Sequence, residues 1–246
     1  MEIRFKHPRL EDRDLINSYL RYSNKRSCEM TFASLYLWSG HYNTGFAVVE
    51  DMLVLGKTSG AAAFSMPAGP ADTKKTLDTL MAYCEEKGMP FRLYDVTKED
   101  FARLEEFYPG MLEITYDRDY ADYVYEAEKL RTLSGKKYHG KKNHINKFKA
   151  LYPDWSYEPI TKENAAECAG LAHVWGEQKG YGDDGEMQAE LCVALNFLRL
   201  FEELEMRGGI LRVNGKIAAF TIGEPAANPD TLLVHVEKAL ADVQGS

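Results

Sequence analysis

The sequence predicts an α+β protein in which mixed sheets are flanked by helices. Two observations lead to this class. Segments with apolar residues at helical spacing, which predict helices, alternate along the chain with short runs rich in β-branched and aromatic residues, which predict strands. The order of helices and strands in the first half of the chain also restarts in the second half, as in a pseudo-repeat. We therefore expect two domains, over residues 1–130 and 131–246.

Turn and cap residues place the elements of the first half. Glu50-Asp51 fits a hairpin turn, Gly88 a helix stop, and Thr97 an N-cap followed by Asp100. The expected helices cover residues 10–22, 31–42, 71–88 and 97–107. The expected strands cover residues 46–50, 52–55, 61–66, 91–96, 112–116 and 123–127.

The second half contains the clearest hairpin, in which Asn214-Gly215 joins two apolar runs. Tyr152-Pro153 closes the first helix of this half, and Gly208-Gly209 is expected to end the longest one. The expected helices cover residues 134–151, 161–180 and 186–207. The expected strands cover residues 155–159, 210–213, 216–223 and 231–238.

Composition excludes several classes of protein. The chain of 246 residues carries a formal charge of -8, which argues against DNA as a partner of the whole surface. Its four cysteines are scattered without a Cys-x-x-Cys motif, as in reduced cytoplasmic proteins. The charged start lacks the apolar core of a signal peptide, and we expect no transmembrane segment. A cytoplasmic location is therefore expected, with a membrane surface still open as a partner.

One segment reverses the sign of the charge. Residues 136–149 hold six lysines and two histidines, and residues 132–153 hold no Asp or Glu. A helix face exposed to water is the plain interpretation. The lack of carboxylates for i,i+4 pairing argues equally for an outside partner that carries phosphate. The residues expected to bind that phosphate are Lys136, Lys137, His139, Lys141, Lys142, His144 and Lys147.

Strand alternation over residues 231–238 places His235 and Glu237 on one face. Near a basic site, such a pair is suited to general acid–base catalysis. The competing interpretation is that both side chains point to solvent from a half-buried sheet. The histidines lack the spacing of a zinc site, so no metal is expected.

The end of the chain, Gln244-Gly245-Ser246, resembles the start of the pyrophosphate-binding loop of GNAT-type acetyltransferases. On that resemblance Gln244 and Gly245 would add backbone N–H groups to the phosphate site. A frayed terminus is the alternative.

Three segments together resemble one bacterial family, whose members are similar to the C-terminal domain of phosphatidylglycerol lysyltransferase. The segments are residues 28–38, 135–148 and 235–239, and the middle one is the most specific. The resemblance covers nearly the whole chain and implies tandem GNAT-like domains. It also implies transfer of an acyl or aminoacyl group. Because a GNAT-like domain continues beyond the equivalent of Glu237, the second domain is expected to be incomplete.

The resemblance implies a cytoplasmic transferase with an aminoacyl-tRNA or an acyl-CoA as donor, and with an amine or hydroxyl acceptor that a membrane surface could present. Glu237 and His235 are then the expected catalytic residues, with Glu237 as the base. A non-catalytic module that binds RNA or an anionic lipid surface is the second hypothesis. A degenerate structural half-domain is the third. The sequence names neither donor nor acceptor.

Overall fold

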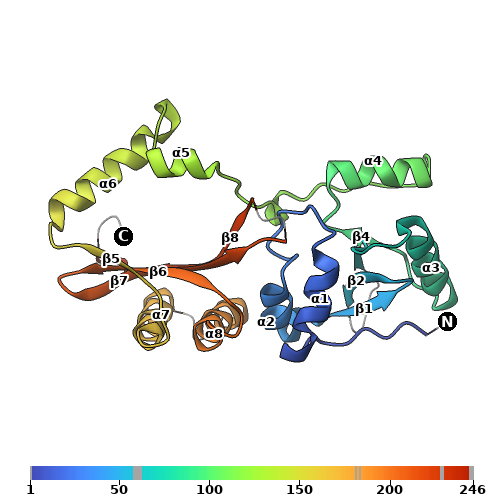
Figure 1. The fold of residues 1–246 in the computed structure, drawn as a ribbon, viewed down its shortest axis with the longest axis horizontal. Helices are drawn as coiled ribbons and strands as arrows, with labels where there is room; N and C mark the ends of the chain where they lie inside the picture. The colour runs from blue at the N-terminus through green and yellow to red at the C-terminus, as the bar shows by residue number, and fades with distance from the viewer. Residues whose placement is uncertain (1, 58–62, 181, 183, 228–229, 244–246) are drawn as a thin grey trace. The chain divides into compact units, whose positions relative to one another are not determined.

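Two four-stranded sheets, each flanked by helices, organise the chain (Figure 1). The structure is a computed structural model that describes residues 2–57, 63–180, 182, 184–227 and 230–243. Its contacts define two compact units, one of residues 1–120 with 225–233 and one of residues 121–224 with 234–246. The α+β class with mixed sheets is confirmed. The domain division at residues 130 and 131 stays a prediction.

The first unit contains a sheet in the order β1-β2-β3-β4. The β1–β2 and β2–β3 pairs are antiparallel, and the β3–β4 pair is parallel. The strands are β1 (Thr44–Val49), β2 (Met52–Lys57), β3 (Phe64–Ser65) and β4 (Leu93–Tyr94). The helices are η1 (Leu10–Asp12), α1 (Arg13–Leu20), α2 (Phe32–Tyr42), α3 (Thr73–Glu86), α4 (Lys98–Phe107) and η2 (Arg118–Tyr120).

Local sequence explains the ends of these elements. Glu50 and Asp51 both have positive φ, 50° and 57°, which is the geometry of a tight hairpin turn between β1 and β2. The Thr31 hydroxyl accepts the N–H of Ser34 at 3.2 Å and so caps α2. Thr97 and Asp100 form a reciprocal capping box at the start of α4. The predicted Thr97 cap and the predicted turn are confirmed, and the Thr31 cap is an addition from the structure.

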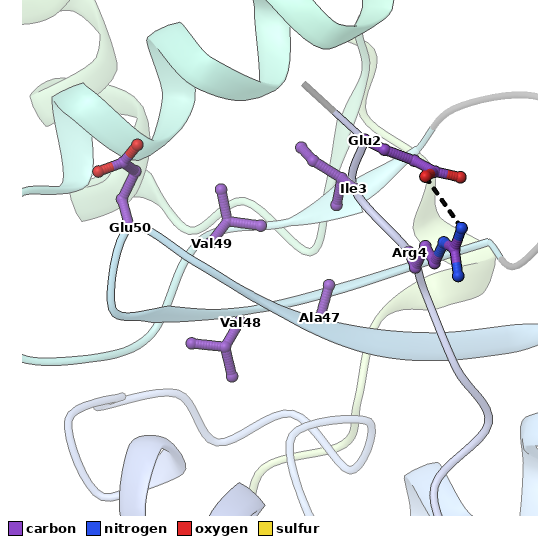
Figure 2. Close-up of a pocket in the computed structure, with 7 residues that line it drawn as sticks. All are labelled: Glu2, Ile3, Arg4, Ala47, Val48, Val49 and Glu50. Atoms are coloured by element: carbon purple, nitrogen blue, oxygen red, sulfur yellow. Dashed lines mark hydrogen bonds and ion pairs between the residues drawn. The ribbon is translucent and has the colours of Figure 1, made fainter.

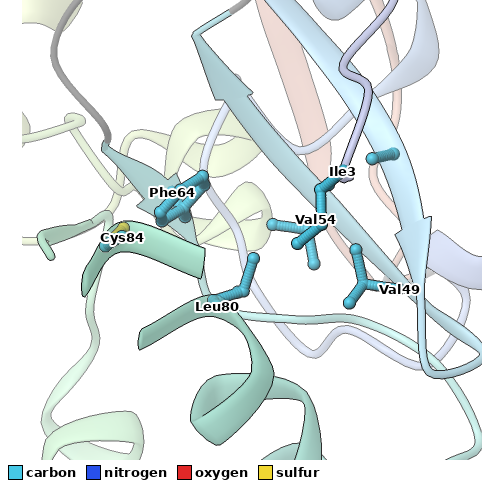
Figure 3. Packing of buried hydrophobic residues seen from close by; sticks show 7 residues of the cluster. Ile3, Val49, Val54, Phe64, Leu80 and Cys84 are labelled. Atoms are coloured by element: carbon cyan, nitrogen blue, oxygen red, sulfur yellow. The ribbon is translucent and has the colours of Figure 1, made fainter. Parts of the chain in front are cut away.

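The core of the first unit lies between the sheet and α3 (Figure 3). Leu80 and Cys84 of α3 pack against Val54 and Phe64 of the sheet, and Ile3 of the N-terminal segment joins them. Each fully buried apolar side chain of this kind contributes about 1.5–3 kcal/mol. Burial also raises the pKa of the Cys84 thiol, so this cysteine acts as a small apolar residue.

The second sheet has the order β5-β6-β7-β8. Helices α7 and α8 cover one of its faces, and α6 lies over the other (Figure 1). The strands are β5 (Ser156–Pro159), β6 (Arg207–Val213), β7 (Lys216–Pro225) and β8 (Leu232–Ala239). The helices are α5 (Ala127–Thr132), η3 (Lys136–Tyr138), α6 (His139–Leu151), α7 (Ala165–Lys179) and α8 (Gly185–Arg199).

The two strands predicted over residues 112–116 and 123–127 are wrong. Residues 112–116 have no regular structure, and residue 127 begins α5. Tyr116 and Tyr123 are 78% and 84% exposed, so within its own unit neither is covered by a strand or helix of the described residues. Alternation of polar and apolar residues is not enough here, because a strand also needs a partner for its backbone groups.

The helix predicted over residues 134–151 is shorter and has two parts, η3 and α6. Leu133 adopts a left-handed conformation after α5, and Gly135 has φ 94°, so the chain turns before the basic segment begins. Helix α5 was not expected. Its Lys129–Glu126 and Arg131–Glu128 ion pairs, each at i,i+3, give the short helix local support.

The helix predicted over residues 186–207 ends at Arg199, and Gly208 and Gly209 belong to β6 instead of ending a helix. At both glycines an added side chain would meet an atom that now occupies that space. A Cβ on Gly208 would lie 2.6 Å from the carbonyl oxygen of Thr221, and a Cβ on Gly209 would collide with the ring of Tyr157. The two glycines therefore mark close packing within the sheet.

Candidate functional site

The lysine surface, defined as Lys136, Lys137, Lys141, Lys142 and Lys147 with His139 and His144, is exposed throughout. It is carried by η3 and α6. Two aromatic residues anchor this segment, since Tyr138 and Phe148 are 7% and 5% exposed. Phe148 packs against Val213 and Ala218 of the sheet. Anchoring through so few side chains leaves the rest of α6 available to a partner.

The lysine surface has no carboxylate partner within the described residues. Aromatic rings, instead of carboxylates, contact some lysines of this segment. The Lys141 ammonium lies 5.7 Å from the centre of the Tyr125 ring, and Lys149 lies 5.1 Å from that of Trp155. Such cation–π contacts orient the side chains but leave their charge uncompensated. A dense positive charge of this kind attracts phosphate.

A cavity of about 410 Å³ opens beside the start of α6. It brings together Lys136, His139 and Lys142, three residues of the predicted phosphate site. The remaining members of the lysine surface do not line it. The rest of the lining is Thr132, Leu133, Ser134 and Gly135. Hydroxyl groups, ammonium groups and the first turns of a helix are all donors suited to phosphate oxygens.

His235 is held by a partner that the sequence did not indicate. Its Nε2 lies 2.8 Å from Oε1 of Glu224 on β7, and its ring stacks on Phe197 of α8 at 5.0 Å. The His235 side chain is only 4% exposed. The interpretation that His235 points to solvent is therefore wrong. A carboxylate on Nε2 leaves Nδ1 as the nitrogen that can accept a proton in the neutral imidazole.

Glu237 has different surroundings from His235. Its side chain is exposed, whereas Val236 and Lys238 on either side of it are both 4% exposed. The expected alternation along β8 is thus interrupted between His235 and Val236. Lys238 makes an ion pair with Glu190 of α8, and its ammonium lies 3.6 Å from the centre of the Trp175 ring. The two predicted catalytic residues are therefore not placed in a common environment.

Sequence reasoning missed Glu224, Glu190 and Phe197. His235 and Glu224 are 11 positions apart, and Lys238 and Glu190 are 48 apart. No local spacing rule links such pairs. The one available signal was Lys238 itself, because a lysine in an apolar strand requires a buried partner.

Other features of the described residues offer less chemistry. A pocket beside β1 is lined by the apolar residues Ile3 and 47–49 and by the charged residues Glu2, Arg4 and Glu50 (Figure 2). Glu2 is already paired with Arg4 at 3.0 Å. In the described part of the chain, no three His, Cys, Asp or Glu residues gather as metal ligands would. Gln244 and Gly245 lie outside the described residues.

Comparison with known proteins places the chain. The family model for the C-terminal region of phosphatidylglycerol lysyltransferase matches residues 20–246. The chain belongs to this family. A crystal structure of a conserved protein of unknown function from Bacteroides thetaiotaomicron is 39% identical, with a TM-score of 0.91. That match covers 100% of this chain and 83% of the other.

A second solved structure shares the fold at lower identity. It is the C-terminal domain of a protein assigned as a lysylphosphatidylglycerol synthetase from Agrobacterium fabrum. It is 11% identical with a TM-score of 0.58, over 95% of this chain and 68% of that one. No curated protein matches the chain. Within the described ranges, no helix of this family member is both long and apolar enough to cross a bilayer.

Proposed function

We propose that this member of the phosphatidylglycerol lysyltransferase C-terminal family transfers an acyl or aminoacyl group from a phosphate-bearing donor. The donor is an aminoacyl-tRNA or an acyl-CoA, and the acceptor is an amine or a hydroxyl. Family membership supports a role related to group transfer. A tandem GNAT-like arrangement of the two sheets and a cytoplasmic location belong to the same proposal.

The chemistry assigns a role to each part. The acceptor nitrogen or oxygen attacks the donor carbonyl carbon, and its proton passes to a base. The bond from that carbon to the CoA sulfur or the tRNA ribose oxygen then breaks, and the departing group takes up a proton. Glu237 is the proposed base, because an exposed carboxylate is open to an acceptor. His235 is the alternative base, through Nδ1.

The observation that carries the proposal is the lysine surface, where several ammonium groups stand without carboxylates beside a cavity of about 410 Å³. Donor phosphates would neutralise these ammonium groups and accept hydrogen bonds from them. The ribose-phosphate of CoA and the phosphate chain of tRNA both meet the requirement. Their sizes differ, so binding assays separate them.

The test is donor binding by a variant in which Lys136, Lys137, Lys141 and Lys142 are changed to Ala. The matched control changes the same number of exposed lysines elsewhere, Lys87, Lys98, Lys179 and Lys216. We expect the first variant to lose binding of CoA or tRNA at low salt and the control to retain it. Equal affinity of both variants would remove the lysine surface from donor binding.

One observation favours a second function. His235 is bound to Glu224 while Glu237 is exposed, so the predicted acid–base pair does not come together. A module that binds RNA or an anionic lipid surface without catalysis needs only the lysine surface. Steeply salt-dependent binding with no turnover of any charged tRNA or acyl-CoA would favour the module.

A further inference from the structure

A second exposed surface of the chain has the opposite charge. The acidic tyrosine segment, residues 113–126, holds five carboxylates, one arginine and four tyrosines, which gives a formal charge of -4. Every residue in it is exposed, and Tyr116, Tyr120 and Tyr123 are 78%, 82% and 84% exposed. Only the three residues of η2 in its middle form regular structure.

Exposure of this extent requires an explanation. Large aromatic and aliphatic side chains gathered on one segment mark a surface that binds something, whereas single exposed apolar residues do not. Ile114 and Val124 add 59% and 69% exposed apolar side chains to the tyrosines. The charge of the segment selects a basic partner, because like charges across an interface are repelled.

The chain itself presents such a partner. Residues 136–149 carry a formal charge of +6. The rest of the chain therefore carries -14, the difference between the total of -8 and this +6. The positive charge stands on α6, which is exposed on every side except at Phe148. A chain this strongly divided in charge attracts other copies of itself at low ionic strength.

One contact shows that the two surfaces are chemically compatible. Tyr125, near the end of the acidic tyrosine segment, holds the Lys141 ammonium 5.7 Å from its ring centre. Tyrosine rings interspersed with carboxylates offer lysines both ring faces and charge partners. Among the described residues, no lysine or arginine lies over the rings of Tyr116, Tyr120 and Tyr123, which stay exposed.

We propose that the acidic tyrosine segment of one copy docks on the lysine surface of a second copy. The contact joins two different surfaces, so copies assemble either as a reciprocal pair with two such contacts or as rings and chains. The same lysines cannot bind a donor phosphate and a second copy at the same time. Polyanions would therefore compete with the second copy and dissociate the assembly. This proposal does not depend on the proposed function, because self-association needs no donor.

The test is sedimentation velocity over a concentration series, at about 20 mM and about 1 M salt. We expect the average mass to rise with concentration at low salt only. Two charge-reversed variants follow, one with Glu113→Lys and Asp119→Lys and one with Lys142→Glu and Lys147→Glu. Each alone should weaken association by about tenfold or more, as expected for several screened charge pairs.

Mixing the two reversed variants decides the matter. The first variant keeps the unaltered lysine surface, with its acidic tyrosine segment made neutral, and the second keeps the unaltered segment, with a less basic α6. Only the mixture pairs an unaltered segment with an unaltered lysine surface, so it should associate more tightly than either variant alone. The control Lys87→Glu with Lys98→Glu, which carries the same change in net charge on exposed lysines elsewhere, should associate as the unaltered protein does. A triple change of Tyr116, Tyr120 and Tyr123 to Ser should weaken association without altering net charge.

A mass that is independent of concentration at low salt would overturn the proposal. So would equal weakening by the control variant, since net charge alone would then account for the effect. Association that survives all the variants would place the contact elsewhere on the chain. Loss of donor binding with intact self-association, or the reverse, distinguishes failure of the proposed function from failure of this one.

Discussion

Replacement of Gly208 by Ala tests the packing that makes the second sheet. The added Cβ would lie 2.6 Å from the carbonyl oxygen of Thr221 and 2.7 Å from Cδ1 of Ile160. The first of these atoms belongs to the backbone of β7 and cannot swing away. Strand β6 must therefore move by several tenths of an ångström from β7, and overpacking of this kind costs about 2–3 kcal/mol.

Gly209 supplies the matched control, because its neighbour is a side chain. A Cβ there collides with Tyr157, whose side chain is 64% exposed and free to rotate toward water. Gly209→Ala should therefore cost less than about 1 kcal/mol. The difference between the two alanine variants isolates the backbone contact from the general effect of replacing glycine in a strand.

Urea denaturation measures both variants. In a Trp38→Phe background, the emission comes from Trp155 and Trp175, both in the second unit, because the chain has three tryptophans. A lower midpoint for Gly208→Ala than for Gly209→Ala, with an unchanged slope, is the expected result. Equal midpoints, or a larger loss for Gly209→Ala, would refute the packing argument.

Three further perturbations test other contacts. The Lys25 side chain is 7% exposed and pairs with Asp95 at 3.2 Å and with Asp100 at 3.5 Å. Lys25→Met should lower the free energy of unfolding by about 3–5 kcal/mol in thermal denaturation, because both carboxylates lose their cation. A loss below about 1 kcal/mol would contradict this. Burial, and then the hydrogen bond to Asp78, raise the pKa of Tyr108, so its contribution is complete below the unfolded value near 10 and is lost as the pH rises above it. Tyr108→Phe should accordingly flatten the fall of stability above pH 10 in an alkaline titration, and an unchanged profile would count against the assignment. The hydrogen bond from Arg212 lowers the pKa of Glu167, so Arg212→Met should reduce the loss of stability on acidification below the unfolded value of about 4.5, and an unaltered acid limb would show that this pair is unimportant.

The sequence predicted the parts of the fold that local chemistry determines. The Thr97–Asp100 capping box and the turns at Glu50-Asp51 and Asn214-Gly215 each depend on residues within four positions of one another. Their backbone geometry follows from side-chain type alone. The basic character of residues 136–149 was equally evident, because charge needs no fold to be counted.

The parts that failed depend on distant neighbours. Gly208 and Gly209 look like a helix stop until Tyr157 and Thr221 are seen to occupy their side-chain space. Residues 112–116 alternate as a strand would, yet no neighbouring strand supplies hydrogen bonds within the described structure. The surroundings of His235 were likewise hidden, because Glu224 and Phe197 reach it only after β7, β8 and α8 assemble.

The salt dependence of tRNA binding tests the central claim most directly. If the lysine surface holds donor phosphates, log K should fall linearly with log salt for the unaltered chain. The variant lacking Lys136, Lys137, Lys141 and Lys142 should then show a slope shallower by about 2.8–3.6 units, at about 0.7–0.9 for each of the four phosphates that a lysine no longer neutralises. Binding of CoA or acetyl-CoA in parallel titrations would identify an acyl-CoA as the donor. An unchanged slope in that variant, or no binding of either donor class by the unaltered chain at low salt, would contradict the account.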